Sequence, residues 1–285
     1  MKQNSMKNEG RKPTDIITKE HLEEFIATQD DFALELYVYD LARKLGFRST
    51  HAGSYTDPST GKARQFDVQA SRACKENFNI YFAIECKALR PSFPLLVSQI
   101  PRVRAESYLH IVRSVGKGRN GNTLLCPQTH ELTDGASIYG LSEFVGKALS
   151  QVGFNGEGKL HSKDSEVFEK WGQAIASSNQ LINRAASLNS LPHEPFHNSA
   201  VLPVLVVPDG TLWTVNYSGL GDHTEPALAQ QAEYFIGSTQ KIDDNPQATF
   251  KLSHLHIVTK TGLESLLQRF REDGDGTVYL QGMLY

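Results

Sequence analysis

Asp67 and the triplet Glu85-Cys86-Lys87 place two acids and a lysine in two neighbouring apolar segments of the chain. Carboxylate and carbonyl oxygens are the ligands that Mg²⁺ prefers, so Asp67, Glu85 and the backbone carbonyl of Cys86 are candidate metal ligands. A metal held there would polarise a phosphate group and lower the pKa of a bound water. Lys87 would orient the attacking water or stabilise charge in the transition state. The residue types therefore predict hydrolysis of a phosphodiester bond.

The acid–lysine triplet lies at the end of a predicted strand. Residues 79–88 are rich in β-branched and aromatic side chains, which predicts a strand buried on both faces. Because side chains alternate along a strand, Glu85 and Lys87 share one face and Cys86 points into the opposite, apolar side. A charged pair at the end of a buried strand costs solvation free energy unless a metal or a substrate satisfies it.

Two further strands are predicted upstream of this one. They cover residues 50–55 and 64–71, and the segment between them, 56–62, has strong turn chemistry. The simplest arrangement is an antiparallel meander of three strands. In that arrangement Asp67 lies near Glu85 on the adjacent strand.

A third acid is available on a predicted helix. Residues 31–45 carry apolar side chains at helical spacing, and Glu35 lies within that otherwise buried pattern. A buried carboxylate needs a partner, so Glu35 is a candidate third acid of the site. The ordinary alternatives are that Glu35 pairs with a nearby arginine or lysine, and that Glu85 and Lys87 form a surface salt bridge.

The order helix, strand, strand, strand, with Asp67 followed by Glu85-Cys86-Lys87, resembles the PD-(D/E)xK superfamily of restriction-endonuclease-like nucleases. The resemblance is carried by residues 30–90. It implies an α/β fold with a restriction-endonuclease-like core, in which a central mixed sheet is flanked by helices. It also implies Mg²⁺-dependent cleavage of DNA or, less often, RNA.

The resemblance also assigns roles to individual residues. It implies that Asp67 is the metal-binding aspartate, Glu85 the second metal ligand and Lys87 the catalytic lysine. Glu35 is similar to the extra acid that many members carry on the first core helix. Phe66 stands where the family pattern has a proline that is often missing.

Some members of the family carry a glutamine on the helix after the E-x-K strand. The candidates in this chain are Gln99, Gln173 and Gln180. Gln173 is favoured, because residues 164–188 predict a long amphipathic helix. The alternative is that Gln173 lies on a solvated helix face.

The composition of the 285-residue chain suits one large α/β domain. Hydrophobic residues make up 39%, which supports a core, and no apolar run is long enough for a membrane span. Residues 1–17 are expected to form a disordered leader, since they lack the apolar stretch of a secretory signal. Three cysteines without metal-ligand spacing indicate free thiols in a reducing cytoplasm.

The net charge of −3 does not indicate a nucleic-acid-binding protein, but the charged residues are unevenly distributed along the chain. Residues 87–119 carry seven basic side chains against Glu106 alone, a local charge of +6. Such a segment could contact phosphates, or its charges could be scattered over unrelated surfaces. Its glycine-rich part, 116–121, predicts a flexible basic loop, because no helix pattern follows it.

The rest of the chain predicts a single elaborated domain from residue 18 to 285, with 89–163 as an irregular insertion after the E-x-K strand. His254 and His256 share a face of a predicted strand and could bind metal, although ordinary packing is favoured. The further predicted elements are helices at 18–29, 142–150, 225–234 and 263–271, a strand at 252–259, and a hairpin of strands 201–207 and 211–217.

These expectations point to a Mg²⁺-dependent endonuclease that acts on DNA in the cytoplasm, with Mn²⁺ able to substitute. The resemblance suggests a bacterial restriction or phage-defence role. A double-strand cut needs two active sites, so a homodimer or larger assembly is expected, and a separate regulatory protein is a further possible partner. The alternatives are an RNA-directed nuclease with the same site and a non-catalytic nucleic-acid-binding subunit of a larger complex.

Overall fold

The structure is a computed structural model that describes residues 16–29, 31–74, 78–114, 127–133, 138–140, 142–162, 165–187, 197–243 and 245–271. Its contacts divide the chain into two compact units, Met1–Asp30 and Asp31–Tyr285. Helix α1 (Lys19–Gln29) belongs to the first unit, and all the other elements belong to the second. The leader lies mostly outside the described residues, and the single domain from residue 18 onward stays a prediction.

The antiparallel meander predicted around the acids is confirmed. Helix α2 (Asp31–Lys44) leads into β1 (Arg48–His51), which pairs with β4 (Val68–Cys74), and β4 pairs with β5 (Phe78–Cys86). Both pairings are antiparallel. The predicted helix and the predicted E-x-K strand therefore form where the apolar patterns placed them.

Each of the two upstream strands is divided in two. The segment between β1 and β4 folds into a separate hairpin of β2 (Ser54–Thr56) and β3 (Ala63–Gln65). Its turn is held by Asp57 Oδ1, which accepts hydrogen bonds from two turn amides. Ala52 ends β1 because its φ of 55° is left-handed and incompatible with an extended strand.

Parallel pairing extends this meander into a mixed sheet. Strand β5 runs parallel to β11 (Asn198–Val207), and α3 (Ser165–Ala186) lies in the connection between them. Strand β11 also runs parallel to β15 (Asn245–Thr259). Helix α4 (Lys260–Arg269) follows β15, and the Thr259 side chain accepts a hydrogen bond from the Gly262 amide to cap it.

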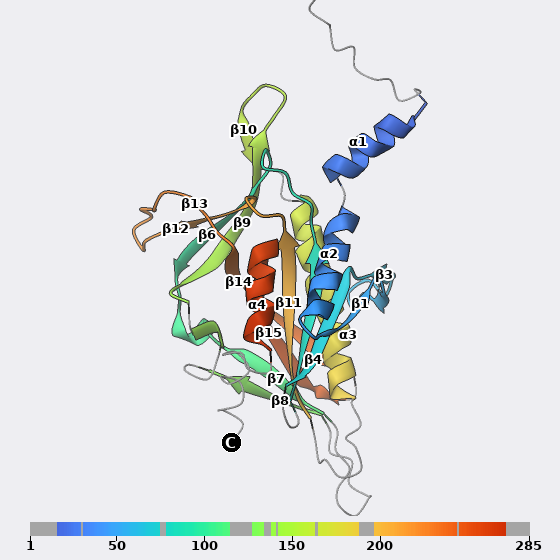
Figure 1. The fold of residues 1–285 in the computed structure, drawn as a ribbon. Helices are drawn as coiled ribbons and strands as arrows, with labels where there is room; N and C mark the ends of the chain where they lie inside the picture. Colours follow the sequence, from blue (N-terminus) through green and yellow to red (C-terminus); the bar gives the residue numbers. More distant parts are fainter. Residues whose placement is uncertain are drawn as a thin grey trace, which may run out of the picture. The chain divides into compact units, whose positions relative to one another are not determined.

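The central strands are covered by helices on both faces, as Figure 1 shows for α2 and α4 in front and α3 behind. Phe82, Ile84 and Cys86 pack in one cluster with apolar side chains of α2 and α4. Tyr81 and Ala83 pack in another cluster with side chains of α3. The alternation predicted for this strand is therefore confirmed, and Glu85 lies on the face that α3 covers.

Residues 89–163 are not the irregular insertion that was predicted, because several of their segments join the same sheet. Strand β6 (Leu95–Pro101) pairs antiparallel with β9 (Phe144–Phe154), and β9 pairs with β14 (Gln231–Ile242). In the part of the chain that is described, the sheet has 13 strands. Its main path is β1-β4-β5-β11-β15-β14-β9-β6-β12-β13, and the strands beside it are β7 (Leu109–Arg113), β8 (Gln128–Leu132) and β10 (Leu160–Ser162).

Three other predictions are wrong. Residues 142–150 and 225–234 do not form helices, because most of them lie in β9, β13 (Ala227–Leu228) and β14. Strand β12 (Leu212–Asn216) does not form a hairpin with β11, since it pairs in parallel with β6. Strands β9 and β12 both pair with β6, which is distant in sequence, whereas β14 pairs with β15, the strand that follows it. Local propensity indicates none of these pairings.

Candidate active site

The structure brings Asp67 and Glu85 together at one end of β4 and β5. Val68 of β4 pairs with Ile84 of β5, so the next positions outward on the two strands are Asp67 and Glu85. Asp67 Oδ2 accepts a hydrogen bond of 2.7 Å from the backbone amide of Cys86. This bond fixes the aspartate carboxylate against the backbone of the E-x-K triplet.

Glu85 is fully buried and lacks a hydrogen bond. Its exposure is 0%, and neither carboxylate oxygen has a hydrogen-bond partner among the described residues. Burial raises the pKa of Glu85 well above its usual range, and the neighbouring charge of Asp67 raises it further. A counter-charge is present, since the Lys170 ammonium lies 3.6 Å from Glu85 Oε2, but it offsets only part of the cost of burying the carboxylate, because the pKa stays raised.

The ammonium that reaches both acids belongs to Lys170 on α3. Its Nζ lies 2.7 Å from Asp67 Oδ2 and 3.6 Å from Glu85 Oε2. Burial alone would lower the pKa of Lys170, but the carboxylates of Asp67 and Glu85 outweigh it and hold the pKa above its usual range. Lys170 is therefore a permanent positive charge between the two acids.

Lys87, the lysine of the E-x-K triplet, contacts another residue. Its Nζ lies 3.5 Å from Oδ2 of Asp31, the first residue of α2. The other oxygen of Asp31 accepts a hydrogen bond from the Ala88 amide. Lys87 follows the last residue of β5, and its backbone amide donates to Val206 of β11. The ammonium that contacts the site acids is that of Lys170, and the catalytic role expected of Lys87 stays a prediction.

Glu35 lies in the same electrostatic environment as the two acids. Its Oε2 is 2.9 Å from His51 Nε2, so its contact is a histidine of β1 and not an arginine or lysine. Burial raises the pKa of Glu35, and the charge of Asp67 adds to that effect, while Lys170 opposes it. The charge of Asp67 therefore acts on Glu35, and the role of Glu35 as a third acid of the site stays a prediction.

Tyr55 is a residue of this site that sequence reasoning missed. It lies on β2, is 3% exposed, and its hydroxyl has no hydrogen-bond partner in the described part of the chain. Burial and then the charge of Glu85 raise the pKa of Tyr55 to about 12. The β2–β3 hairpin thus buries a tyrosine hydroxyl on which the charge of Glu85 acts.

The three candidate glutamines have different environments. Gln180 bridges α3 to the strands, because its Oε1 accepts from Gln69 of β4 at 3.0 Å and its Nε2 donates to the Ser54 carbonyl at 3.2 Å. Gln173 is half-buried on the same helix, whereas Gln99 is buried in β6. Gln180 is therefore the glutamine that touches the site face of the sheet.

A signal for Lys170 was present in the sequence as a polar stripe. Lys170, Gln173, Ser177, Gln180 and Arg184 follow one another at alternating spacings of three and four residues. Residues at that spacing lie on one face of a helix. The apolar stripe that predicted α3 lies beside this polar stripe on the same helix.

The fit of a divalent metal rests on the donor set at β4 and β5. Asp67 and Glu85 supply hard carboxylate oxygens, and the Lys170 ammonium that contacts both shows that a positive charge is accommodated between them. The Cys86 side chain is buried in the opposite apolar cluster, so only its backbone could contribute. No group of three or more His, Cys, Asp or Glu in the described residues is arranged to hold a metal. Water and substrate oxygens would supply the remaining ligands of the metal.

No family model, no curated protein and no solved structure matches the chain. The site is therefore interpreted from its own geometry.

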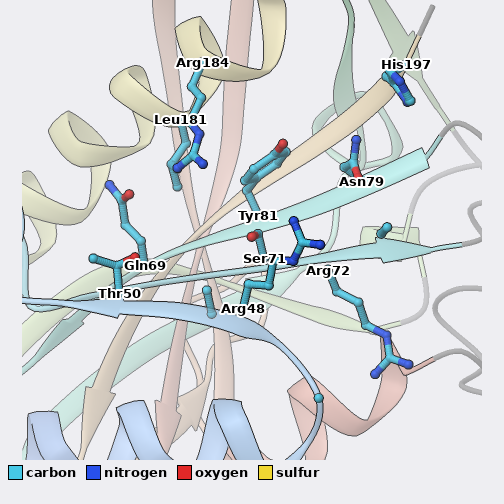
Figure 2. A pocket seen from close by; sticks show the side chains of 13 residues that line it. Arg48, Thr50, Gln69, Ser71, Arg72, Asn79, Tyr81, Leu181, Arg184 and His197 are labelled. Carbon is cyan, nitrogen blue, oxygen red and sulfur yellow. The ribbon is translucent and has the colours of Figure 1, made fainter. Parts of the chain in front are cut away.

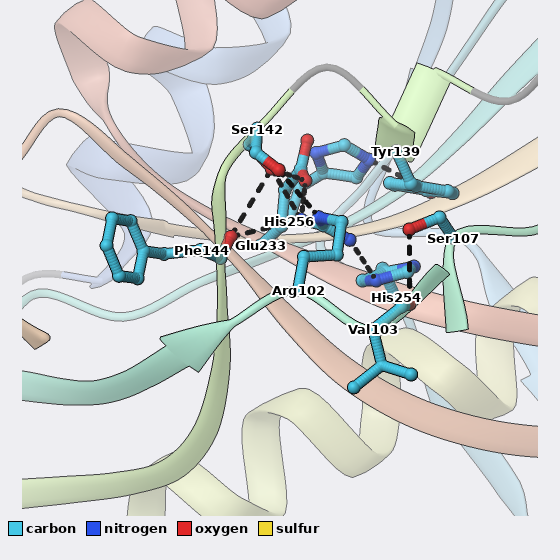
Figure 3. Close-up of polar contacts among 9 residues, drawn as sticks. All are labelled: Arg102, Val103, Ser107, Tyr139, Ser142, Phe144, Glu233, His254 and His256. Carbon is cyan, nitrogen blue, oxygen red and sulfur yellow. Dashed lines mark hydrogen bonds and ion pairs between the residues drawn. The ribbon is translucent and has the colours of Figure 1, made fainter. Parts of the chain in front are cut away.

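A second polar network lies away from these acids (Figure 3). Arg102, which follows β6, forms a close ion pair with Glu233 of β14 and donates to His254 Nε2 at 2.8 Å. Tyr139 stacks on His254 with ring centroids 4.0 Å apart, and its hydroxyl lies 3.1 Å from His256 Nε2. The two histidines of β15 are therefore packed and hydrogen-bonded, which favours the structural reading over metal binding.

Part of the basic segment 87–119 makes internal contacts. Arg102 is buried with Glu233, and Arg113 donates to Asn198. Lys117, Arg119 and the glycine-rich loop 116–121 lie outside the described residues. These two arginines are thus engaged by other residues, and the contact of this segment with phosphates stays a prediction.

The stability of the protein is expected to fall as the pH decreases from about 6.5, the unfolded pKa of histidine. Burial lowers the pKa of His254 to about 2 and that of His256 to about 3. Between these values and 6.5 the unfolded chain binds more protons, so each histidine removes about 1.4 kcal/mol of stability per pH unit. Urea unfolding at pH 7 and pH 5 measures this loss. The His254→Gln/His256→Gln variant should lose less on acidification, whereas an equal loss would contradict the assignment.

The described residues contain no helix that is both long enough and apolar enough to span a membrane.

Proposed function

We propose that this chain is a Mg²⁺-dependent endonuclease that hydrolyses phosphodiester bonds in DNA. The observation that carries the proposal is Glu85, fully buried beside Asp67 and without a hydrogen bond among the described residues. Strongly perturbed acids with a specific charged neighbour are typical of functional sites. Lys170, which contacts both acids, and Glu35 would supply further charged groups for phosphodiester hydrolysis.

The proposal includes a restriction-endonuclease-like core. It would consist of α2, β1, β4 and β5, followed by α3 and β11. The support is the order helix, strand, strand, strand, with Asp67 at the start of β4 and Glu85 near the end of β5. The mixed pairing of β5, antiparallel to β4 and parallel to β11, is in accord with it.

Each residue of the site would have a different role in the reaction. Asp67 and Glu85, with the backbone at Cys86, would hold Mg²⁺ or Mn²⁺, which supplies Lewis-acid polarisation of the phosphate and an activated water. Lys170 keeps a positive charge at the acid pair and would stabilise negative charge that develops on the phosphate. Asp31 holds the Lys87 ammonium at 3.5 Å, so Lys87 would act on substrate only after leaving that contact.

The direct test is the cleavage of plasmid DNA by the purified protein with Mg²⁺. Asp67→Ala is expected to abolish cleavage, because it removes both a metal ligand and the partner of Lys170. Assays on RNA in parallel distinguish an RNA-directed nuclease with the same site. A non-catalytic binding subunit would leave both substrates intact and show no Asp67-dependent Mg²⁺ or Mn²⁺ binding in calorimetry.

The two lysines give a sharper prediction. Lys170→Ala is expected to lower the cleavage rate by about 10²-fold or more, since one preorganised positive group is worth that much in a dry site. Lys87→Ala is expected to retain most of the activity, and Lys251→Ala, a half-exposed lysine on β15, serves as the control. Full activity in Lys170→Ala together with its loss in Lys87→Ala would return the catalytic role to the E-x-K lysine.

The biological setting proposed for this activity is restriction or phage defence in the cytoplasm. It rests on the resemblance of Asp67 and Glu85-Cys86-Lys87 to the family pattern. A homodimer or larger assembly would provide the two sites of a double-strand cut. Sedimentation of the protein with and without duplex DNA tests the assembly.

A further inference from the structure

A second feature on the site face of the sheet is a cavity of about 680 Å³ at the opposite end of β4 and β5. Figure 2 shows the side chains that line it, between α3 and the strands. The pairing of Ser71 with both Arg48 and Tyr81 places these three residues in one row across β1, β4 and β5. Arg184 of α3 faces this row, since its charge acts on the Tyr81 hydroxyl.

The lining of this cavity is strongly cationic. It contains three arginines and one histidine, and no acidic residue is among the described residues that line it. Arg72 is engaged elsewhere, because its guanidinium donates to the Leu45 carbonyl at 3.1 Å. Arg48 and Arg184 are exposed, and neither forms an ion pair with a described carboxylate. Two exposed guanidinium groups without counter-charges, beside the hydroxyl groups of Ser71 and Tyr81, are suited to an anion with several acceptor oxygens.

The cavity and the acid pair lie on the same face of the sheet. Tyr81 and Asn79 lie on the same face of β5 as Glu85, four and six residues before it, which at 3.3 Å per residue is roughly 13 to 20 Å. The polar stripe of α3 covers the same span. Lys170 lies at the acids, Gln180 bonds to Gln69 in the cavity wall, and Arg184 is at the far end.

We propose that this cavity, which we call the Arg48–Arg184 pocket, binds a backbone phosphate of the nucleic acid whose scissile phosphate lies at Asp67 and Glu85. The inference rests on the proposed function. The separation of about 13 to 20 Å corresponds to about four to six nucleotide steps of a duplex at 3.4 Å per step. The pocket would fix the register of the strand on the protein without reading its sequence, because phosphate contacts carry no base information.

The test measures duplex binding without cleavage. A 20-base-pair duplex is titrated by fluorescence anisotropy into the Glu85→Gln protein over a range of salt concentrations. Adding Arg48→Ala and Arg184→Ala is expected to weaken binding by about ten- to a hundredfold. The slope of log K against log salt should fall by about two, roughly one for each phosphate contact. Arg43→Ala, an exposed arginine on α2 outside the pocket, should change neither quantity.

The results of these binding experiments distinguish a failure of the Arg48–Arg184 pocket from a failure of the proposed nuclease function. Unchanged affinity and slope in the double variant would overturn the pocket, even if wild-type protein cleaves plasmid. An arginine-dependent loss of duplex binding would support it, even if no cleavage is found. Calorimetry with inorganic phosphate and with adenosine monophosphate identifies the source: tight, Arg184-dependent binding of the mononucleotide without duplex binding would overturn the backbone assignment. Arg184→Lys retains the charge and should recover part of the salt slope, which a folding defect would not.

Discussion

Replacing Glu85 with glutamine is expected to abolish DNA cleavage and, without metal, to raise the free energy of unfolding at neutral and basic pH. Cleavage should fall by about 10²-fold or more, because a candidate metal ligand and its charge are lost. Stability should increase because the buried carboxylate has no hydrogen bond in the described residues, and glutamine carries no charge to desolvate. An uncompensated buried group of this kind costs on the order of 1–3 kcal/mol, or more when charged.

The effect of Glu85→Gln on the free energy of unfolding should depend on pH. Burial and then Asp67 raise the pKa of Glu85 in the folded protein, so above its unfolded pKa the folded state binds the extra proton. The stability contributed by protonated Glu85 is therefore complete below the unfolded pKa and is lost as the pH rises through the folded one. The advantage of Glu85→Gln should be small near pH 4 and grow towards pH 8. Urea unfolding in a chelating buffer at both pH values measures it.

The matched control is Glu225→Gln, which changes an exposed glutamate in a loop. It should affect neither the cleavage rate nor the pH dependence of stability. If Glu85→Gln were equally destabilising at pH 4 and pH 8, the carboxylate would be a satisfied member of a structural ion pair with Lys170. The proposed active site would then lose its main support.

Replacing Arg102 with alanine is expected to cost about 3–5 kcal/mol of stability, the largest effect foreseen for a residue outside the candidate active site. The Arg102 side chain is 5% exposed and contacts Glu233, His254 and the carbonyls of two further residues. Its removal leaves the Glu233 carboxylate buried without its counter-charge. Burial already raises the pKa of Glu233, while Arg102 opposes that rise.

Two comparisons isolate the cause of this effect in urea unfolding at pH 7. Lys159→Ala breaks an ion pair with Glu157 in which both side chains are more than two-thirds exposed, and should change stability by less than about 1 kcal/mol. Arg102→Met combined with Glu233→Leu removes both charges and should recover much of the loss. A cost in the double variant as large as in Arg102→Ala would show that packing, and not the unpaired charge, dominates.

The local parts of the site could be predicted because they depend on short-range patterns. The alternation of residues in β5 separates Glu85 from Cys86, and the antiparallel pairing of β4 with β5, its neighbour in the chain, places Asp67 opposite Glu85. The apolar spacing in α2 likewise predicted that Glu35 would lie near the acids, which its electrostatic coupling to Asp67 supports.

The predictions that were wrong concern which segments form strands and which strands pair. Strands β9 and β12 both pair with β6, which is far from each of them in sequence. Strand β14 pairs with the next strand, β15, so there the error lies in the local pattern, which predicted a helix for residues 225–234. Cross-strand contacts stabilise a sheet, so a strand with weak local preference is defined by what it pairs with.

The sequence by itself determined which acids meet: Asp67 and Glu85 are brought together by two strands that are neighbours in the chain. Only the tertiary structure decided which lysine joins them. Lys87 follows Glu85 by two residues but pairs with Asp31, whereas Lys170 arrives on α3 after a long crossover. The reason is physical: alternation along a strand sets the face on which a side chain starts, but a flexible lysine places its charge where packing and neighbouring carboxylates allow.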